Sequence, residues 1–405
     1  MNSKETLLHF DLHAKNEGVR VSCSVFSPPA LLCSSLFSSG QKRQFKMTEM
    51  RSWDAIILGG GIIGLSLARE LRRHGASVLI IERSEPGREA SYAAAGMLAP
   101  WGGDLPPSLQ TLAEASARMY PEFVAEVEDE SGHKVDLRDQ GAIVFFSDHE
   151  QSPLPEGAMP LAAEELGKLE PHISASDRAF RLEERSVDPR ALSAASFQAA
   201  RHHNVDVVSG SPVTQITCES SGLSVQTAHS HYPAAWVVNC CGAWAGEIKV
   251  HGTDSCNVPA RPVKGQMLSV AAPRGTLQRV VRTPEVYLVP RSDGRILIGA
   301  TVEEAGFDKR VDPADIRRLR QEATKFVPQL DEARMLEAWA GLRPSTPDDL
   351  PILSATETPG YFVATGHFRN GILLAPITAQ LMGELVRGSQ PELDISSFAL
   401  ARFQK

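Results

Sequence analysis

Three glycines near residue 60 have the spacing of a dinucleotide-binding turn. Gly59, Gly61 and Gly64 form the pattern Gly-x-Gly-x-x-Gly directly after the mostly apolar run 54–58. The first glycine permits a tight turn, the second lets the backbone approach a pyrophosphate, and the third lets the following helix pack on the strand. The unpaired N–H groups and the dipole at the start of that helix favour anionic phosphates. These residues therefore predict a dinucleotide site.

Glu82 supplies the acidic residue that such a site requires. It ends a second apolar run, 78–81, which follows a helical pattern over 65–74. Its carboxylate can accept hydrogen bonds from a ribose 2′-OH and would repel a 2′-phosphate, which disfavours NADP. A glycine-rich turn alone is also common in purely structural loops. Here the strand, turn, helix, second strand and acid occur in one unit, which favours the functional interpretation.

This unit is followed by a mixture of helical and strand patterns. Helical periodicity covers residues 109–130, 161–169, 189–202, 313–326 and 377–387. Strand-like runs cover residues 141–146, 205–208, 213–217, 223–227, 235–239, 266–270, 286–289, 296–298 and 361–363. Because regular strand–helix alternation stops after the first unit, we predict an α/β fold in which a Rossmann-like domain is interrupted by an α+β domain. The first would have a parallel sheet with helices on both faces, and the second a mainly antiparallel sheet.

Both predicted domains are discontinuous along the chain. The dinucleotide-binding domain is expected to comprise residues 51–100, 185–260 and 335–400. The second domain, which would bind the substrate, is expected to comprise residues 101–184 and 261–334.

Composition excludes several classes of protein. The chain has 405 residues, enough for two or three domains, with 42% hydrophobic and 22% charged residues, as is usual for globular proteins. The formal net charge of −8 provides no basic field for nucleic acid. No apolar run is long enough to span a bilayer. We therefore expect a protein without a nucleic-acid partner and without a membrane span.

The cysteines indicate a reducing compartment. They are Cys23, Cys33, Cys218, Cys240, Cys241 and Cys256. None forms a C-x-x-C pair, so neither a metal site nor a redox pair is predicted. The adjacent Cys240 and Cys241 are expected on or after a buried strand as small packing residues. This usage favours the cytoplasm.

Residues 1–50 differ from the rest of the chain. The segment 22–40 is rich in Ser and Pro, and its apolar stretch is too short for a secretory signal. Acidic residues at Glu5, Asp11 and Glu17 argue against a transit peptide. We expect a disordered or non-native extension, with translation starting at Met1, Met47 or Met50.

Four stretches together resemble a known family. They are 59–64 with Glu82, 91–100 (SYAAAGMLAP), 341–344 (GLRP) and 366–376 (GHFRNGILLAP). Over about residues 54–390 the chain resembles the D-amino-acid-oxidase-like flavoproteins, and most closely the glycine oxidases of thiamine biosynthesis. The cofactor implied is FAD. It would be noncovalent, because monomeric sarcosine oxidases tether FAD through a cysteine in the C-terminal third and this chain has none after Cys256.

The resemblance also implies the FAD contacts. Ile62 and Ile63 would lie at the pyrophosphate turn, Glu82 and Arg83 at the adenosine ribose, and Val213 near the adenine. The flavin side would be lined by Ala90, Ser91, Ala95, Gly96 and Met97, in a run that is also typical of the start of an alanine-rich helix. The isoalloxazine would be wrapped by His367, Phe368, Arg369, Asn370, Gly371, Ile372 and Leu373. Backbone N–H groups there would stabilise the negative charge of reduced flavin.

Three residues match substrate contacts of the family. Arg343, which we expect in a rigid turn before Pro344, would bind the substrate carboxylate through its planar fork. Arg369 and Tyr287 match further substrate contacts. A surface salt bridge is the ordinary role of a single arginine, and a half-buried strand position is equally typical of a tyrosine. Glu285 and Val302 occupy pocket-adjacent positions that vary in the family, so the substrate range stays open.

The activity implied is oxidative deamination of glycine to glyoxylate, ammonia and hydrogen peroxide, with the imine feeding thiazole formation in thiamine synthesis. Sarcosine or small D-amino acids would be further substrates. The partners expected are a small amino acid, oxygen, further copies of the chain in a homo-oligomer, and thiazole-synthesis enzymes.

Three alternatives stay open at this point. The first is an oxidoreductase for sarcosine or D-amino acids with another electron acceptor. The second is a flavin-binding subunit without its own substrate. An NAD-dependent dehydrogenase is disfavoured, because that fold lacks the stretch 366–371.

Overall fold

The computed structural model describes residues 52–404, apart from 102–104, 147–153, 155–156, 175–177, 221 and 252–256. The expectation for residues 1–50 lies outside the described residues, as do Cys23, Cys33 and Cys256. In the part of the chain that is described, no helix combines the length and the apolar character needed to cross a bilayer.

The first sheet contains the predicted dinucleotide unit. Its parallel strands are β9 (Asp206–Val208), β2 (Val78–Ile81), β1 (Trp53–Leu58), β12 (His231–Asn239) and β20 (Tyr361–Thr365). Antiparallel pairs add β11 (Gly222–Thr227), β10 (Val213–Glu219) and β19 (Ile352–Ala355), and β13 (Lys249–His251) lies parallel to β10. The early part of β12 pairs with β11 and its later part with β20, so β12 joins the parallel and antiparallel regions.

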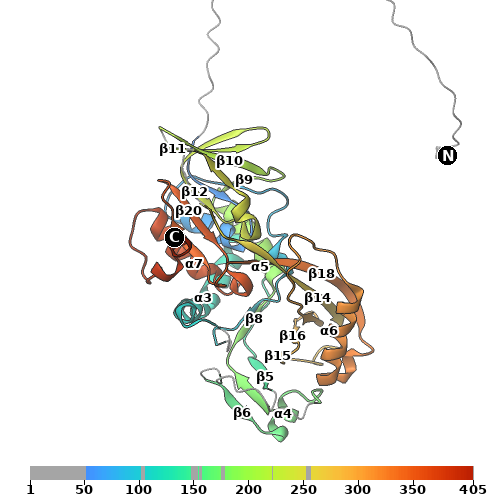
Figure 1. The fold of residues 1–405 in the computed structure, drawn as a ribbon. Helices are drawn as coiled ribbons and strands as arrows, with labels where there is room; N and C mark the ends of the chain where they lie inside the picture. The colour runs from blue at the N-terminus through green and yellow to red at the C-terminus, as the bar shows by residue number, and fades with distance from the viewer. Residues whose placement is uncertain are drawn as a thin grey trace, which may run out of the picture. The chain divides into compact units, whose positions relative to one another are not determined.

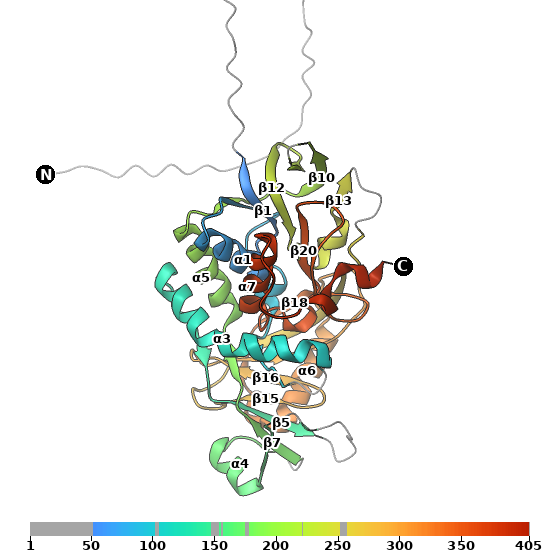
Figure 2. The same cartoon turned by 90° about the vertical axis from the view of Figure 1, so that its left-hand side faces the viewer.

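Four α-helices cover one face of this sheet: α1 (Ile62–Arg73), α3 (Pro107–Ser131), α5 (Pro189–His202) and α7 (Ala375–Val386). Figure 2 shows α1, α5 and α7 gathered together, with α3 beside them. Helix α5 begins as predicted, because the Asp188 carboxylate accepts hydrogen bonds from two backbone N–H groups of its first turn and proline occupies the first position.

Both faces of β1 and β2 are buried, which explains their continuous apolar sequence. Ala55 and Ile57 pack towards the α-helices, whereas Ile56 and Leu58 pack on the other side. That second face is covered by residues of β10 and β11 and by the short 3-10 helices η1 (Gly242–Glu247) and η5 (Leu400–Phe403). The helices on this face are therefore short 3-10 segments, assisted by antiparallel strands.

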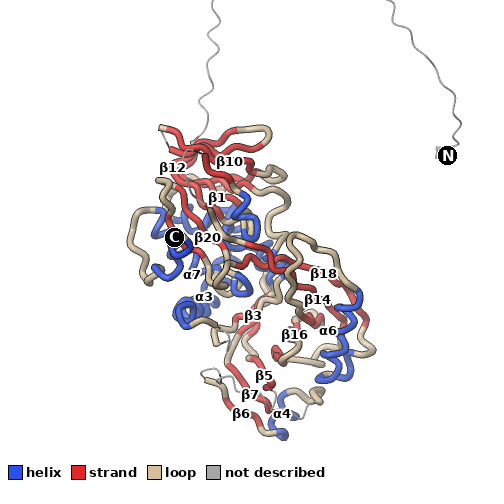
Figure 3. Tube along the Cα trace, in the orientation of Figure 1, coloured by secondary structure: helices blue, strands red, loops and turns tan. Residues whose placement is uncertain are grey.

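The second sheet is mainly antiparallel, as predicted. Its strands, in order, are β18 (Arg334–Ser345), β14 (Arg261–Ala271), β17 (Arg295–Gly299), β16 (Tyr287–Pro290), β15 (Val280–Arg282), β5 (Ala142–Phe146), β7 (Arg178–Leu182) and β6 (Met159–Leu161). Only β15 and β5 pair in parallel among these described strands. Helix α6 (Pro313–Phe326) packs on β14 and β17 and lies beside β14 in Figures 1 and 3. Helix α4 (Ala163–Leu169) contributes Leu166 to the same core.

Short elements complete the fold. A small sheet is formed by β3 (Met97–Leu98), β8 (Arg185–Val187) and β4 (Leu137–Arg138). The remaining helices are α2 (Ala90–Ala93) and the 3-10 turns η2 (Pro328–Leu330), η3 (Phe368–Asn370) and η4 (Ser396–Phe398).

Two segments pack with a different predicted domain from the one to which the sequence assigned them. Helix α3 was expected in the substrate-binding part, but its apolar side packs with α5 and α7 over the first sheet. Strand β18 begins at the expected start of a dinucleotide-binding segment, yet it pairs along its length with β14 of the second sheet. The predicted turn around Arg343 is wrong for the same reason, because residue 343 lies within β18.

Candidate active site

A cavity of about 750 Å³ lies between residues of the two sheets. One part of its lining follows the carboxyl ends of the parallel strands β1, β2, β12 and β20, where open α/β sheets bind their ligands. The other part comes from β14, β16 and β18 of the second sheet. The cavity is therefore built from segments far apart in the sequence.

Nearly all of the predicted site residues line this one cavity. They are Gly59, Gly61, Ile62, Ile63, Glu82, Arg83, Ala90, Ser91, Ala95, Gly96, Met97, Val213, Tyr287, Arg343, His367, Phe368, Arg369, Asn370, Gly371, Ile372 and Leu373. Gly64 is the exception. A Cβ at that position would overlap the carbonyl oxygen of Gly59, so Gly64 serves the close packing of α1 on the turn.

The glycine turn leaves open space at its centre. Gly59 has a φ of 97°, and a Cβ there would lie 2.6 Å from the carbonyl oxygen of Cys240. A Cβ on Gly61 would meet only the Ser91 hydroxyl, at 3.4 Å. That hydroxyl accepts a hydrogen bond from the Ile62 N–H at 2.9 Å. A methyl group at Gly61 would thus project into space that a pyrophosphate can use.

Glu82 and Arg83 are held at the end of β2. The Glu82 carboxylate is almost fully buried and accepts hydrogen bonds from the Gly60 N–H at 2.8 Å and the Ser84 N–H at 2.9 Å. The Arg83 guanidinium lies 3.4 Å from the centre of the Trp244 ring. Trp244 also stacks on Phe307, with ring centres 5.3 Å apart. Sequence reasoning had singled out neither aromatic residue.

The two cysteines after β12 also line the cavity. Burial raises the pKa of the Cys240 thiol, and it raises that of Cys241 to about 12. Both groups are therefore protonated thiols near neutral pH, which makes them poor nucleophiles. This agrees with the prediction that they act as packing residues.

Small side chains bring α2 and β18 together. A Cβ on Gly341 would overlap the Cβ of Ala93, and the Trp339 indole N–H donates to the Ala93 carbonyl at 3.1 Å. Residues 90–93 form a short helix that ends at Ala93, so the alanine-rich run does not start a helix, as its alternative interpretation would require. The same stretch lines the cavity.

The C-terminal stretch is fixed from behind by α3 and α7. Tyr120 and Ser116 of α3 donate hydrogen bonds to the carbonyls of Ile372 and Leu373. The His367 ring pairs with the Thr378 hydroxyl at 3.1 Å, and burial lowers the pKa of His367 to about 3. Phe368 has a φ of 48°, a strained conformation for a non-glycine residue. The backbone facing the cavity is thus held in a specific conformation by buried, uncharged partners.

Tyr287 projects over a glycine of the neighbouring strand. It pairs with Gly299 of β17, where a Cβ would lie 2.7 Å from the tyrosine hydroxyl. The Tyr287 hydroxyl contacts the Met267 sulfur at 3.6 Å. Burial raises the pKa of this hydroxyl, and the neighbouring Arg343 guanidinium only partly offsets that rise. Tyr287 is therefore a neutral hydrogen-bond donor.

Arg343 presents a guanidinium beside Tyr287. Its Nη1 atom donates to the carbonyl oxygens of Thr301, at 3.1 Å, and Lys264, at 3.2 Å. A Cβ on Gly265 would overlap this guanidinium, so the glycine makes the room that it occupies. Within the described residues, Arg343 forms no ion pair with a carboxylate. Its charge is available to an anionic ligand.

Glu285 and Val302 were predicted next to the substrate pocket, and only Val302 lines the cavity. Val302 lines the cavity and is 71% exposed, whereas the lining includes Pro284 and Val286 but not Glu285. Arg282, directly opposite Tyr287 in β15, also lines the cavity and pairs with Glu184 at 2.9 Å. A glycine inside a strand, such as Gly265, is the sequence signal that could have indicated a side chain lying close to the strand backbone.

The lining fits the FAD that the sequence leads us to expect. At one end, the Gly61 turn and Glu82 provide an open phosphate position and a ribose acceptor. At the other end, apolar residues such as Met97, Val144 and Met267 provide a surface for a flat ring. Among the described residues, no cluster of side chains has the composition of a metal site.

Comparisons with known proteins agree with this geometry. The model of the "FAD dependent oxidoreductase" family, DAO, matches residues 54–385. The chain is 33% identical to a glycine oxidase of Bacillus licheniformis, covering 84% of this chain and 94% of that protein. A bifunctional ThiO/ThiG protein of Trichormus variabilis is 34% identical over 87% of this chain, which spans only 55% of that longer protein. The crystal structure of glycine oxidase from Geobacillus kaustophilus superimposes with a TM-score of 0.81 at 31% identity, covering 87% of this chain and 99% of that one.

Proposed function

The chain belongs to the DAO family of FAD-dependent oxidoreductases, and we propose that it oxidises glycine. The overall reaction converts glycine, oxygen and water to glyoxylate, ammonia and hydrogen peroxide. Sarcosine and small D-amino acids are further candidate substrates. The similarity to proteins named glycine oxidase supports the choice of glycine.

The observation that carries this proposal is the Arg343 guanidinium. It lies in the cavity, donates to two backbone carbonyls, interacts with the Tyr287 hydroxyl, and has no carboxylate partner among the described residues. A planar guanidinium binds a carboxylate through two parallel hydrogen bonds. The neutral Tyr287 hydroxyl beside it can donate one more. Together the two side chains form a carboxylate clamp suited to an amino acid.

The remaining steps require positioning more than acid–base chemistry. Bound FAD would accept a hydride from the substrate Cα and pass electrons to oxygen. Arg343 and Tyr287 would hold the substrate carboxylate and so keep the substrate in one orientation in the cavity. A fixed orientation lowers the entropic part of the activation barrier. Arg369 would assist this positioning, and the stretch 367–373, which lines the cavity, would hold the ring of the cofactor. No side-chain base is needed when the amine of the substrate is neutral.

We also propose that the imine product supplies thiazole formation in thiamine synthesis. The similarity to bifunctional ThiO/ThiG proteins supports a functional link to such an enzyme. A homo-oligomer is a further proposal, which light scattering of the purified holoprotein would test.

The direct test is anaerobic mixing of the purified holoenzyme with glycine, sarcosine and D-alanine, followed by aeration. We expect glycine to bleach the flavin absorbance and air to restore it with release of hydrogen peroxide. Bleaching without peroxide would indicate a different electron acceptor. No bleaching by any of the three compounds would refute the proposal.

A further inference from the structure

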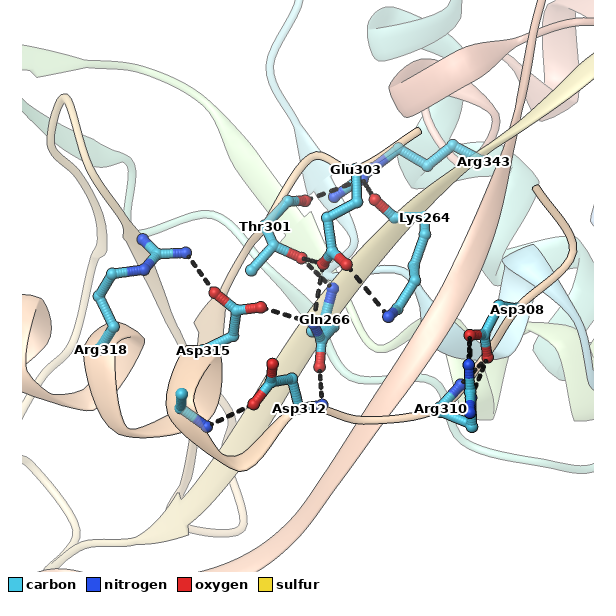
Figure 4. A network of polar contacts seen from close by, with 11 residues as sticks. Lys264, Gln266, Thr301, Glu303, Asp308, Arg310, Asp312, Asp315, Arg318 and Arg343 are labelled. Carbon is cyan, nitrogen blue, oxygen red and sulfur yellow. Dashed lines mark hydrogen bonds and ion pairs between the residues drawn. The ribbon is translucent and has the colours of Figure 1, made fainter. Parts of the chain in front are cut away.

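A partly buried polar network lies directly behind the carboxylate clamp. Figure 4 shows Glu303 between Thr301, Gln266 and Lys264, with Arg343 reaching the same segment. None of the first four residues belongs to the lining of the cavity. Lys264 and Thr301 accept hydrogen bonds from Arg343 through their backbone carbonyls, so the side chains of the network play no direct part in the binding described above.

Glu303 is the centre of this network. One carboxylate oxygen accepts hydrogen bonds from the Thr301 hydroxyl and from the Gln266 amide, the latter at 2.8 Å. The other oxygen pairs with the Lys264 ammonium at 3.1 Å. The backbones of Lys264 and Glu303 also exchange hydrogen bonds of 2.9 and 3.0 Å. Glu303 therefore joins the strand β14 to the segment that follows β17.

Gln266 extends the network to helix α6. Its side chain is fully buried and donates to the Asp315 carboxylate at 2.9 Å, while its carbonyl accepts from the Asp312 N–H at 2.6 Å. Its backbone N–H donates to the Thr301 hydroxyl at 2.8 Å. The start of α6 thus holds the Gln266 side chain, and the backbone N–H of the same residue joins it to Thr301.

Two residues of the network accept hydrogen bonds from Arg343 through their backbone carbonyls. The carbonyl oxygens of Lys264 and Thr301 are the two acceptors of its Nη1 atom. Both residues are bonded to Glu303 through their side chains. A shift of Glu303 would therefore move both acceptors, and the guanidinium with them.

We propose that Glu303, acting through Lys264 and Thr301, is a positioning residue that sets the orientation of Arg343 toward the substrate carboxylate. The inference rests on the proposed carboxylate-binding role of Arg343. Lys264 is only 5% exposed, so its charge needs the Glu303 carboxylate as a partner. Without that partner, the ammonium would seek water or another acceptor and displace its own backbone carbonyl.

The test compares Glu303→Gln with Glu304→Gln in the holoenzyme. Glu304 is the adjacent residue, but it is exposed and pairs with Arg261 at the surface. Acetate serves as a carboxylate probe, and its dissociation constant is measured from the change in flavin absorbance. We expect Glu303→Gln to raise this constant and the KM for glycine about tenfold, within the range seen for residues in one hydrogen-bond network. The kcat and the FAD affinity should stay within about twofold, and Glu304→Gln should match the wild type in all four quantities.

Making the same substitution in an enzyme that lacks Arg343 separates a positioning role of Glu303 from a general loss of stability. In an Arg343→Ala enzyme, Glu303→Gln should cause no further rise in the KM for glycine, because the group that it positions is gone. An equal rise in both backgrounds, or an unchanged acetate affinity in the single variant, would overturn the proposal. If Glu303→Gln does not fold, Thr301→Val removes the Thr301–Glu303 bond and leaves the Lys264–Glu303 pair in place, and the same outcomes apply to it. If acetate binding depends on Arg343 but the enzyme does not oxidise glycine, only the proposed substrate would be refuted.

Discussion

The guanidinium of Arg343 occupies the space that a side chain at Gly265 would fill. A Cβ built on Gly265 would overlap the Nη1, Nη2 and Cζ atoms of Arg343. Gly265 lies directly opposite Gly341 in the β14–β18 pair, and Arg343 lies two residues further along β18. Because Gly265 has no side chain, the long Arg343 side chain can pass over β14 at this position toward the cavity.

This relationship predicts the effect of Gly265→Ala. The added methyl group must displace the guanidinium, because its Cβ would overlap three guanidinium atoms. We expect the KM for glycine to rise at least about tenfold, equivalent to roughly 1.4 kcal/mol of lost binding, with FAD retained. Steady-state kinetics and the flavin spectrum measure the two quantities.

Gly167→Ala is the matched control for that substitution. A Cβ at Gly167 would meet no atom within 4 Å, so the same chemical change is made in open space. Its kinetics should equal those of the wild type. A Gly265→Ala enzyme with an unchanged KM would show that Arg343 does not bind the substrate from this position.

The two later glycines of the turn should respond differently to alanine. Gly61 has an ordinary φ of −74° and open space around its Cβ position, so Gly61→Ala should leave the unfolding free energy of the apoprotein within about 1 kcal/mol of the wild type. Its FAD affinity should fall at least about tenfold, because the methyl group enters the pyrophosphate position. Calorimetric titration of apoprotein with FAD gives this value.

Gly64→Ala should instead destabilise the fold. Its Cβ would overlap the Gly59 carbonyl, and overpacking of this kind costs about 1–3 kcal/mol or more. Urea unfolding of the apoprotein measures the loss. If both variants lost FAD affinity and stability to the same extent, the division of roles between the two glycines would be wrong.

Tyr287 should contribute a neutral hydrogen bond at all working pH values. Burial raises its pKa above the ordinary value of 10, so the hydroxyl keeps its proton below that pH. Tyr287→Phe should raise the KM for glycine about 2–13-fold, as expected for loss of about 0.5–1.5 kcal/mol. The shape of the kcat/KM profile between pH 6 and 9 should not change. A pH inflection that disappears in this variant would mean that Tyr287 titrates during catalysis.

His367 should make the protein less stable as the pH falls. Its pKa is about 3 in the folded state, against about 6.5 when unfolded. Above pH 6.5 both states are neutral and His367 adds no pH dependence. Below it the unfolded chain binds a proton that the folded chain excludes, which lowers stability by up to about 1.4 kcal/mol per pH unit until about pH 3. Replacing His367 by Gln should reduce this slope in urea unfolding between pH 6 and 4, and an unchanged slope would contradict the buried neutral histidine.

Local motifs predicted one half of the site better than the other. The tight turn at Gly59 and the close packing at Gly64 lie within one short unit, so both follow from spacing alone. The overlap of Gly265 with Arg343 depends on the pairing of β14 with β18, which are about eighty residues apart and whose register no local pattern encodes. The amphipathic pattern of α3 likewise showed that one side is buried but not that its partners are α5 and α7. Trp244 was missed because its contact with Arg83 joins segments distant in sequence.

The most direct test of the central claim is rapid anaerobic mixing of glycine with the wild-type holoenzyme and with Arg343→Ala. We predict that glycine reduces the wild-type flavin in a saturable reaction. In the variant, the apparent dissociation constant for glycine should rise about 10–150-fold, as expected from the loss of roughly 1.5–3 kcal/mol of charged hydrogen bonding, with FAD still bound. A wild-type flavin that glycine does not reduce, or a variant that binds glycine as tightly as the wild type, would contradict the account.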